Sequence, residues 1–194
     1  MSEAPIDRDL TPSTYHASVG AVSIRLALPA DAAGIAVVHV HSWQWAYRGL
    51  LPDSLLDGLS IVDRRTRWES ILHQESAESR LWIAERDRLI VGFCGTGPSR
   101  DADATLEVPE VNAIYLERSA AGQGIGRALF SHAVSDLRER GYQAATLWVL
   151  ESNGRARRFY EAAGWQPDGK TKTETLSGVD VHEVRYRHSI DSSH

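Results

Sequence analysis

The 194-residue sequence contains one cysteine, two lysines and no long run of hydrophobic residues. The single cysteine, Cys94, excludes an intrachain disulfide and a zinc site built from cysteines. No segment approaches the ~20 consecutive apolar residues that span a bilayer, and residues 1–16 lack the basic-then-apolar layout of a signal peptide. We therefore predict a cytoplasmic protein with no membrane partner.

Positive charge is also scarce, because 21 basic residues face 26 acidic ones and the net charge is −5. Such a chain has no overall basic field to attract nucleic acid, so no nucleic-acid partner is expected. The 8 histidines show no metal-ligand spacing. His39 and His41 are two apart in a predicted helix and point to different sides of it. No metal site is predicted.

The chain is long enough for one sizeable core, and 42% of its residues are hydrophobic. No repeat, low-complexity block or linker divides it. We predict a flexible leader over residues 1–21, a single domain over 22–189 and a short tail over 190–194.

Hydrophobic periodicity predicts an α+β domain with a mixed sheet. The two runs on either side of the charged turn 86–88 are typical of a hairpin. A helix start is expected at Asp31, whose side chain can cap free amides, and the polar segment 166–175 is interpreted as a connection. The expected strands are 23–28, 81–85, 89–96, 110–116, 144–150 and 179–188, and the expected helices are 31–49, a short one from Pro52, 63–74, 127–140 and 153–163.

A glycine-rich segment, AGQGIGRAL at residues 121–129, lies between a predicted strand and a predicted helix. Glycines at alternate positions, Gly122, Gly124 and Gly126, allow a tight turn that exposes successive N–H groups. The free amides and partial positive charge of the following helix start favour an anion, typically a phosphate. On spacing alone, the alternative that these glycines only shape the turn stays open.

Two other phosphate-binding patterns do not fit. The dinucleotide fingerprint G-x-G-x-x-G/A fails because its last position is Arg127 or Leu129. Residues 164–171, GWQPDGKT, match the P-loop pattern G-x-x-x-x-G-K-[ST], but Pro167 lies inside it and a helix instead of a strand precedes it. We therefore interpret residues 164–171 as a turn.

A second informative segment, NGRARRFYEAAGW, covers residues 153–165. On this predicted helix Phe159 and Ala163 share one side and are expected in the core. Tyr160 lies on the adjoining side and can bring its hydroxyl to the edge of a cleft. The alternative is that Tyr160 only packs.

These two segments, in this order, resemble the motifs of the GNAT superfamily of N-acetyltransferases. The family pattern is [RQ]-x-x-G-x-[GA] followed by N-x-x-[AS]-x-x-[FL]-Y-x-x-x-G-[FW]. Trp43–Pro52 also resembles the first-helix region of many members. One departure is Ala121, where the family usually has Arg or Gln, and we expect it to weaken the pyrophosphate contact without abolishing it. The matching residues are Gly124, Ile125, Gly126, Asn153, Ala156, Phe159, Tyr160, Gly164 and Trp165.

The resemblance implies a GNAT-like fold over residues 22–188, with a mixed, mostly antiparallel central sheet flanked by helices. It also implies acetyl-coenzyme A as the acyl donor, without a metal. The strand edge at Ile114 and Leu116 would pair with the pantetheine amides, and Asn153 would touch the pantetheine arm. The backbone that would hold the pyrophosphate comprises Gly122, Gln123, Gly124, Ile125, Gly126 and Arg127.

The resemblance further implies direct attack of an amine on the thioester. Tyr160 would protonate the leaving thiolate as general acid, and Glu110 would act as the base, with Glu107 as the second candidate. Trp43 and Tyr47 would contact the acceptor.

The function implied is therefore an acetyl-coenzyme A-dependent N-acetyltransferase acting on a primary amine of a small molecule, peptide or protein. The alternative is a non-catalytic sensor of acyl-coenzyme A with the same fold, and a homodimer stays open. Acidic side chains near the presumed entrance, Asp101, Asp103, Glu107 and Glu110, would suit a cationic amine, with a merely solvated acidic loop as the alternative.

Overall fold

The computed structural model describes residues 21–74, 76–176 and 178–190. The predicted leader and tail lie outside these residues, apart from Ala21 and Ile190. Ile190 is buried, and its amide donates to the Gln143 carbonyl at 2.7 Å. The packed region therefore reaches one residue beyond the predicted domain boundary at 189.

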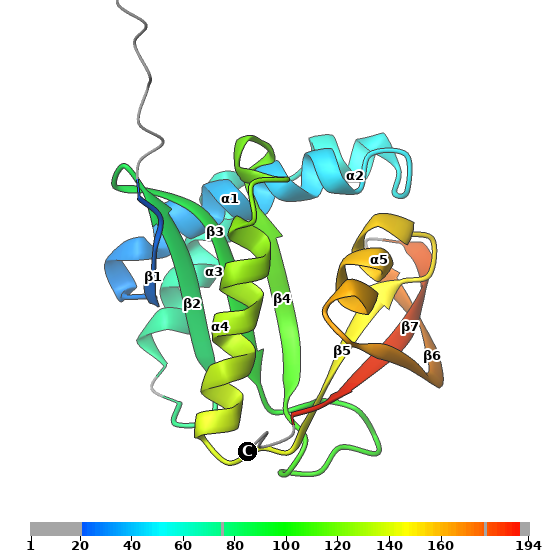
Figure 1. Cartoon of the computed structure of the whole chain (residues 1–194). Helices are drawn as coiled ribbons and strands as arrows, with labels where there is room; N and C mark the ends of the chain where they lie inside the picture. The colour runs from blue at the N-terminus through cyan, green and yellow to red at the C-terminus, as the bar shows by residue number, and fades with distance from the viewer. Residues whose placement is uncertain (1–20, 75, 177, 191–194) are drawn as a thin grey trace, which may run out of the picture.

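The described residues form a seven-stranded sheet in the order β1-β2-β3-β4-β5-β7-β6, with helices on both faces (Figure 1). All pairings are antiparallel except β4 with β5, which confirms the mixed, mostly antiparallel sheet. The strands are β1 Ser23–Leu26, β2 Arg80–Arg86, β3 Leu89–Gly97, β4 Glu110–Leu116, β5 Ala144–Leu150, β6 Gln166–Leu176 and β7 Val179–Ser189. The α-helices are α1 Ala32–Ala46, α2 Asp53–Asp57, α3 Ile61–His73, α4 Ile125–Glu139 and α5 Gly154–Ala162, with short 3₁₀ turns at Pro29–Asp31 and Arg118–Ala120.

Two of the predicted local features are wrong. Residues 166–176 form strand β6 instead of a connection, because β7 pairs with them while their side chains stay largely exposed at the sheet edge. Asp31 does not cap α1, since its carboxylate accepts hydrogen bonds from Arg25 and from the Leu28 amide.

The two faces of the sheet have separate cores. Helix α4 covers one face, where Leu129, Phe130 and Leu137 are buried against the strands. Helices α1 and α3 cover the other face, as Figure 1 shows, and bury Ile35 and Val38 there. Side chains of β4 therefore face either α4 or the layer of α1 and α3.

Strands β4 and β5 diverge in the middle of the sheet. They are paired only at Glu110 and Thr146, where the Thr146 amide donates to the Pro109 carbonyl at 2.9 Å. The pairing of β3 with β4 shifts by one residue, and Asn112 is the extra residue of this bulge. The divergence opens the sheet along the edge of β4.

Candidate active site

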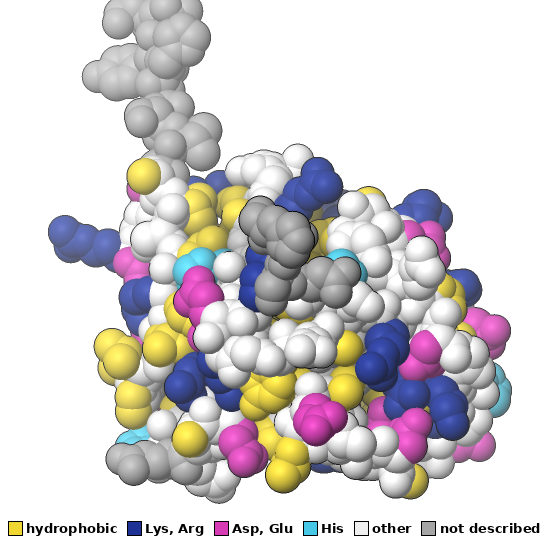
Figure 2. Space-filling model, turned by 60° about the horizontal axis from the view of Figure 1, so that its bottom comes forward, with side chains coloured by type: hydrophobic (Ala, Val, Ile, Leu, Met, Phe, Trp, Pro, Cys, Tyr) yellow, Lys and Arg dark blue, Asp and Glu magenta, His cyan; other side chains and the backbone are white. Residues whose placement is uncertain are grey.

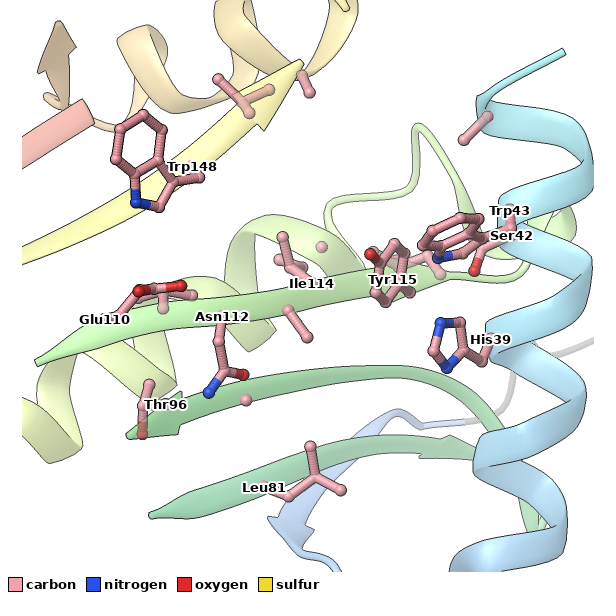
Figure 3. Close-up of a pocket in the computed structure, with 18 of the residues that line it drawn as sticks. His39, Ser42, Trp43, Leu81, Thr96, Glu110, Asn112, Ile114, Tyr115 and Trp148 are labelled. Carbon is pink, nitrogen blue, oxygen red and sulfur yellow. The ribbon is translucent and has the colours of Figure 1, made fainter. Parts of the chain in front are cut away.

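A cleft of about 1110 Å³ fills the opening between β4 and β5. Side chains of α1, α3, α5 and β7 and the start of α4 also line it. Figure 3 shows Glu110, Asn112, Ile114 and Tyr115 along β4, with Trp148 across the opening on β5. Residues far apart in the sequence thus meet at one cavity.

The glycine-rich segment lies at the end of the cleft where α4 begins. Gly124 precedes the helix in the left-handed conformation, with φ of 80°, which favours glycine. No side chain caps this helix end, and the first intrahelical bond joins the Ala128 amide to the Gly124 carbonyl. The amides before Ala128 are therefore available to an anion.

Only some residues of the glycine-rich segment line the cleft. Gly122, Gly124, Gly126 and Arg127 line the cleft, whereas the Ile125 side chain is buried in the core. Gln123 does not line it. Its side chain accepts a hydrogen bond from Arg86 at 2.8 Å and donates one to the Ser119 carbonyl at 2.5 Å, which holds the loop.

The main-chain groups of β4 reach the cleft at alternate residues. The Glu117 amide donates to the Val91 carbonyl of β3, so the main-chain groups of Ile114 and Leu116 point away from β3 and into the opening. The Leu116 carbonyl, however, accepts a hydrogen bond from Trp45 Nε1 at 3.2 Å. This contact was not predicted, and it takes up one of the two lone pairs of that carbonyl oxygen.

Asn153 and Tyr160 come together at the α5 side of the cleft. The Asn153 side chain caps α5 by accepting the Ala156 amide at 3.0 Å, which explains why the helix begins there. Tyr160 packs against Phe130 and is only 8% exposed, yet it lines the cleft. Burial raises the pKa of Tyr160, so its phenol keeps its proton at neutral pH and can serve as a donor.

Glu110 lies at the opposite end of β4 from the glycine loop and is only 8% exposed. Burial, followed by the neighbouring Asp101, raises its pKa. Its nearest side-chain partner is the Ser99 hydroxyl, at 3.5 Å. Glu107, the second candidate, is exposed and does not line the cleft, so the geometry favours Glu110.

A second carboxylate in the cleft was missed. Glu183 on β7 lines the cleft, and burial raises its pKa, but Lys172 forms an ion pair with it at 3.3 Å. Glu183 points to the cleft side of β7, and this could be predicted only with knowledge of where β7 lies in the sheet. Glu174 also lines the cleft and pairs with Lys172 at 2.7 Å, so of the three cleft carboxylates Glu110 is the one without an ion pair to a described residue.

The predicted acceptor residues belong to an aromatic wall. Trp43 and Tyr47 line the cleft with ring centroids 5.1 Å apart, and His39 stacks on Tyr115 at 5.1 Å. His39 accepts a hydrogen bond from Trp68 at 3.1 Å. Burial lowers the pKa of His39 to about 3, so its ring is neutral at physiological pH.

The acidic side chains expected at the entrance are largely neutralised. Arg185 on β7, 9% exposed, donates to Asp101 and Asp103 at 2.8 Å and to Asp168 at 2.7 Å. Trp148 Nε1 also donates to Asp101 at 2.9 Å. The expectation that these aspartates attract a cationic amine is therefore wrong, because they hold the 98–109 loop against β6 and β7.

Residues 164–171, which match the P-loop pattern, follow a helix and lead into a strand, whereas a P-loop follows a strand and leads into a helix. Gly164, with φ of 84°, ends α5. The interpretation of 164–171 as a turn is wrong from Gln166 on, because these residues belong to β6, whose pairing with β7 is interrupted between Pro167 and Thr171. Lys170 lies 3.7 Å from Asp103 at the surface.

Within the described ranges, no group of three or more His, Cys, Asp or Glu side chains is arranged to hold a metal. Nor does any helix in those ranges have the length and apolar character to cross a membrane.

Comparisons with known proteins decide the family. Residues 38–165, from α1 to the end of the second motif, match the model of the acetyltransferase (GNAT) family. The chain belongs to this family. A probable N-acetyltransferase of Mycobacterium tuberculosis is 31% identical over 175 residues, which cover 86% of this chain and 92% of that protein. This GNAT protein is thus an N-acetyltransferase.

Solved structures agree on the GNAT fold. An N-acetyltransferase of Thermoplasma acidophilum in complex with coenzyme A superposes with a TM-score of 0.66 at 18% identity, covering 87% of this chain and 99% of that one. A putative acetyltransferase of Salmonella typhimurium with acetyl-coenzyme A gives a TM-score of 0.65 at 18% identity, covering 90% and 96%. At these identities the likeness shows the fold alone.

Proposed function

We propose that this acetyltransferase moves an acetyl group from acetyl-coenzyme A directly to a primary amine of a small molecule or peptide. One observation carries the proposal: the uncapped amides of the α4 start, the diverged edge of β4 and the protonated Tyr160 all face one cleft. Two of the similar structures hold coenzyme A or acetyl-coenzyme A, which supports this donor.

The cleft fits the coenzyme part by part. The pyrophosphate would lie on the amides of residues 122–127, where a side chain at position 124 would also need an unfavourable φ. Arg127 lines the cleft and would add positive charge there. The pantetheine arm would pair with Ile114 and the Leu116 amide, beside Asn153.

The chemistry then needs two proton transfers. The amine nitrogen forms a bond to the thioester carbonyl carbon, and the carbon–sulfur bond breaks. Glu110, directly or through water, takes the proton that the amine loses, and Tyr160 gives its proton to the departing thiolate. The raised pKa of Glu110 makes it a better base than an exposed glutamate, and the buried phenol of Tyr160 is protonated before the step.

A thiol-release assay with a panel of amines tests this function. We expect amine-dependent release of coenzyme A together with an N-acetylated product seen by mass spectrometry. A chain that binds acetyl-coenzyme A tightly but releases no thiol with any amine would instead be a sensor, and would overturn the proposal.

A further inference from the structure

The cleft is basic although the chain as a whole is acidic. Its lining includes seven basic side chains and three acidic ones, Glu110, Glu174 and Glu183, in a chain of net charge −5. On the face shown in Figure 2, by contrast, basic and acidic side chains lie interspersed. The basic lining residues are Arg64, Arg67, Arg80, Arg100, Arg127, Arg155 and Lys172.

Several of these cations already have partners. Lys172 pairs with Glu174 and Glu183, and Arg80 donates to main-chain carbonyls of residues 76, 77 and 79. Arg155 lies over the Trp45 ring at 4.4 Å. These side chains are committed to the fold or lie beside the coenzyme end.

Arg64 and Arg67 on α3 are different. They are three residues apart and so share one side of the helix, which lines the cleft. Among residues 21–74, 76–176 and 178–190, neither has a carboxylate within ion-pair distance, whereas Arg65 between them pairs with Glu69 at 2.7 Å. Arg100 and Arg127 also line the cleft without an ion pair to a described residue, so what distinguishes Arg64 and Arg67 is that they are neighbours on one side of one helix.

This arrangement is unfavourable without a ligand. Arg64 is half-buried, with its guanidinium 5.6 Å from the centroid of the Trp43 ring. Burial and the neighbouring Arg67 lower its pKa, which means that the charged form is disfavoured where it stands. Arg67 is exposed, so the hydration that is lost is that of Arg64. An anion bound to both guanidinium groups would compensate for this loss and for the repulsion between the two charges, and planar guanidinium groups suit carboxylate or phosphate oxygens.

The position of the pair separates it from the coenzyme. Arg64 and Arg67 lie close enough to His39 that, after burial, their charges also lower its pKa, and His39 stacks on Tyr115. They belong to the α1 and α3 layer, whereas the uncapped amides begin α4 on the opposite face of the sheet. The coenzyme's phosphates would therefore bind at the start of α4, away from Arg64 and Arg67.

The pair also lies at the far end of the cleft from Glu110. In Figure 3, His39 and Trp43 lie at one end and Glu110 at the other, with Asn112 between them. Glu110 and Tyr115 are five residues apart on β4, about 16 Å at the usual rise of ~3.3 Å per residue. A molecule with an anion at α3 can thus extend along β4 toward the reacting centre.

We infer that Arg64 and Arg67 form a subsite for an anionic group of the acceptor, so that the acceptor is an amine that also carries a carboxylate or a phosphate. This inference rests on the proposed acetyl transfer for the location of the reacting amine. The anion fixes one end of the acceptor at α3, and the amine at the other end reaches the thioester beside Tyr160.

Matched pairs of amines test the inference by kinetics. The carboxylate arm compares ω-amino acids of increasing length, from γ-aminobutyrate to 12-aminododecanoate, with the alkylamines that lack the carboxylate, because the cleft runs about 16 Å from Tyr115 to Glu110. The phosphate arm compares ω-aminoalkyl phosphates, from phosphoethanolamine to the longer homologues, with the matching amino alcohols. We expect kcat/KM to be at least tenfold higher for the anionic member of one arm. In the double variant Arg64→Gln, Arg67→Gln, this preference should disappear through a raised KM, with the neutral amine and acetyl-coenzyme A unaffected.

The single variants Arg64→Gln and Arg67→Gln are measured as well, and Arg65→Gln is their matched control, because Arg65 is exposed on the same helix and its replacement also removes one positive charge. It should leave the preference unchanged. Equal losses for anionic and neutral amines in the double variant, or no preference in the wild type, would overturn the anionic subsite while leaving acetyl transfer intact.

A binding measurement keeps the subsite testable if no amine is acetylated. Calorimetry of γ-aminobutyrate and phosphoethanolamine is run on the protein saturated with coenzyme A. Binding that is lost in the double variant and kept in Arg65→Gln supports the subsite even if the proposed activity fails. Absence of binding of both ligands to the wild type overturns it.

Discussion

Replacing Arg185 by methionine removes the cation that joins three segments beside the cleft. Its guanidinium bonds Asp101 and Asp103 of the 98–109 loop and Asp168 of β6. Methionine keeps the length and apolar stem of the side chain but leaves the three carboxylates without their partner. The variant should therefore destabilise the fold and loosen the loop that carries Ser99, the hydrogen-bond partner of Glu110.

The size of the effect follows from exposure. The side chain of Arg185 is 9% exposed, and those of Asp101 and Asp168 are 11% and 16% exposed. Removing Arg185 therefore costs most of the stability that is lost when one partner of a fully buried ion pair is removed. Removing one partner of a buried ion pair costs about 3–5 kcal/mol, and the residual solvent contact reduces this to about 2–3 kcal/mol. For a chain of this size the loss corresponds to roughly 4–12 °C in Tm.

Urea unfolding of the two proteins measures the loss, with Arg48→Met as the control. Arg48 also bonds two aspartates, but it is 44% exposed, so the control should lose much less. Arg185 lowers the pKa of Asp103, so its stabilisation is complete above the ordinary value of 3.8 and is lost as the pH falls through the lowered pKa. Equal unfolding midpoints for wild type and Arg185→Met at pH 7 would refute the reasoning.

Three further outcomes are expected. Because burial raises the pKa of Glu110, kcat/KM should fall as the pH drops through a value above 4.5, and Glu110→Gln should abolish this pH dependence. A buried carboxylate with a raised pKa destabilises the fold once it is ionised, so Glu110→Gln should also increase Tm at pH 7. Gly124→Val should weaken acetyl-coenzyme A binding in calorimetry more than tenfold, about 1.4 kcal/mol, whereas Gly141→Val, with a similar φ at the other end of α4, should not. Lys170→Ala should leave turnover within about threefold, and a thermal shift with ATP that depends on Lys170 would instead revive the P-loop reading.

Sequence patterns predicted the elements whose side chains alternate or repeat clearly. Residues 144–150 were predicted and observed as a strand, because both faces of β5 are largely buried and all its residues except Thr146 are apolar. Gly141, with φ of 88°, ends α4 as expected. Strand β6 was missed because an edge strand at the surface needs no apolar alternation, and only its pairing with β7 makes it a strand.

The candidate site was predictable where one motif supplies both the residue and its conformation. The glycine loop and Asn153 are of this kind, since each residue acts within its own segment. The roles of Arg185, Glu183, Arg64 and Arg67 were not predictable, because their environment depends on residues of other helices, strands and loops that only the folded sheet brings together. Two of the predicted acidic residues, Asp101 and Asp103, have another role for the same reason.

Steady-state kinetics of Tyr160→Phe test the central claim most directly. Tyr160 lines the cleft, and the replacement keeps its buried ring against Phe130 and removes only the hydroxyl. We predict that kcat falls about 10²-fold or more, as is typical for loss of a general acid, while the Kd for acetyl-coenzyme A changes little. Turnover near that of the wild type, in a variant that binds the coenzyme normally, would show that Tyr160 only packs and would contradict the account.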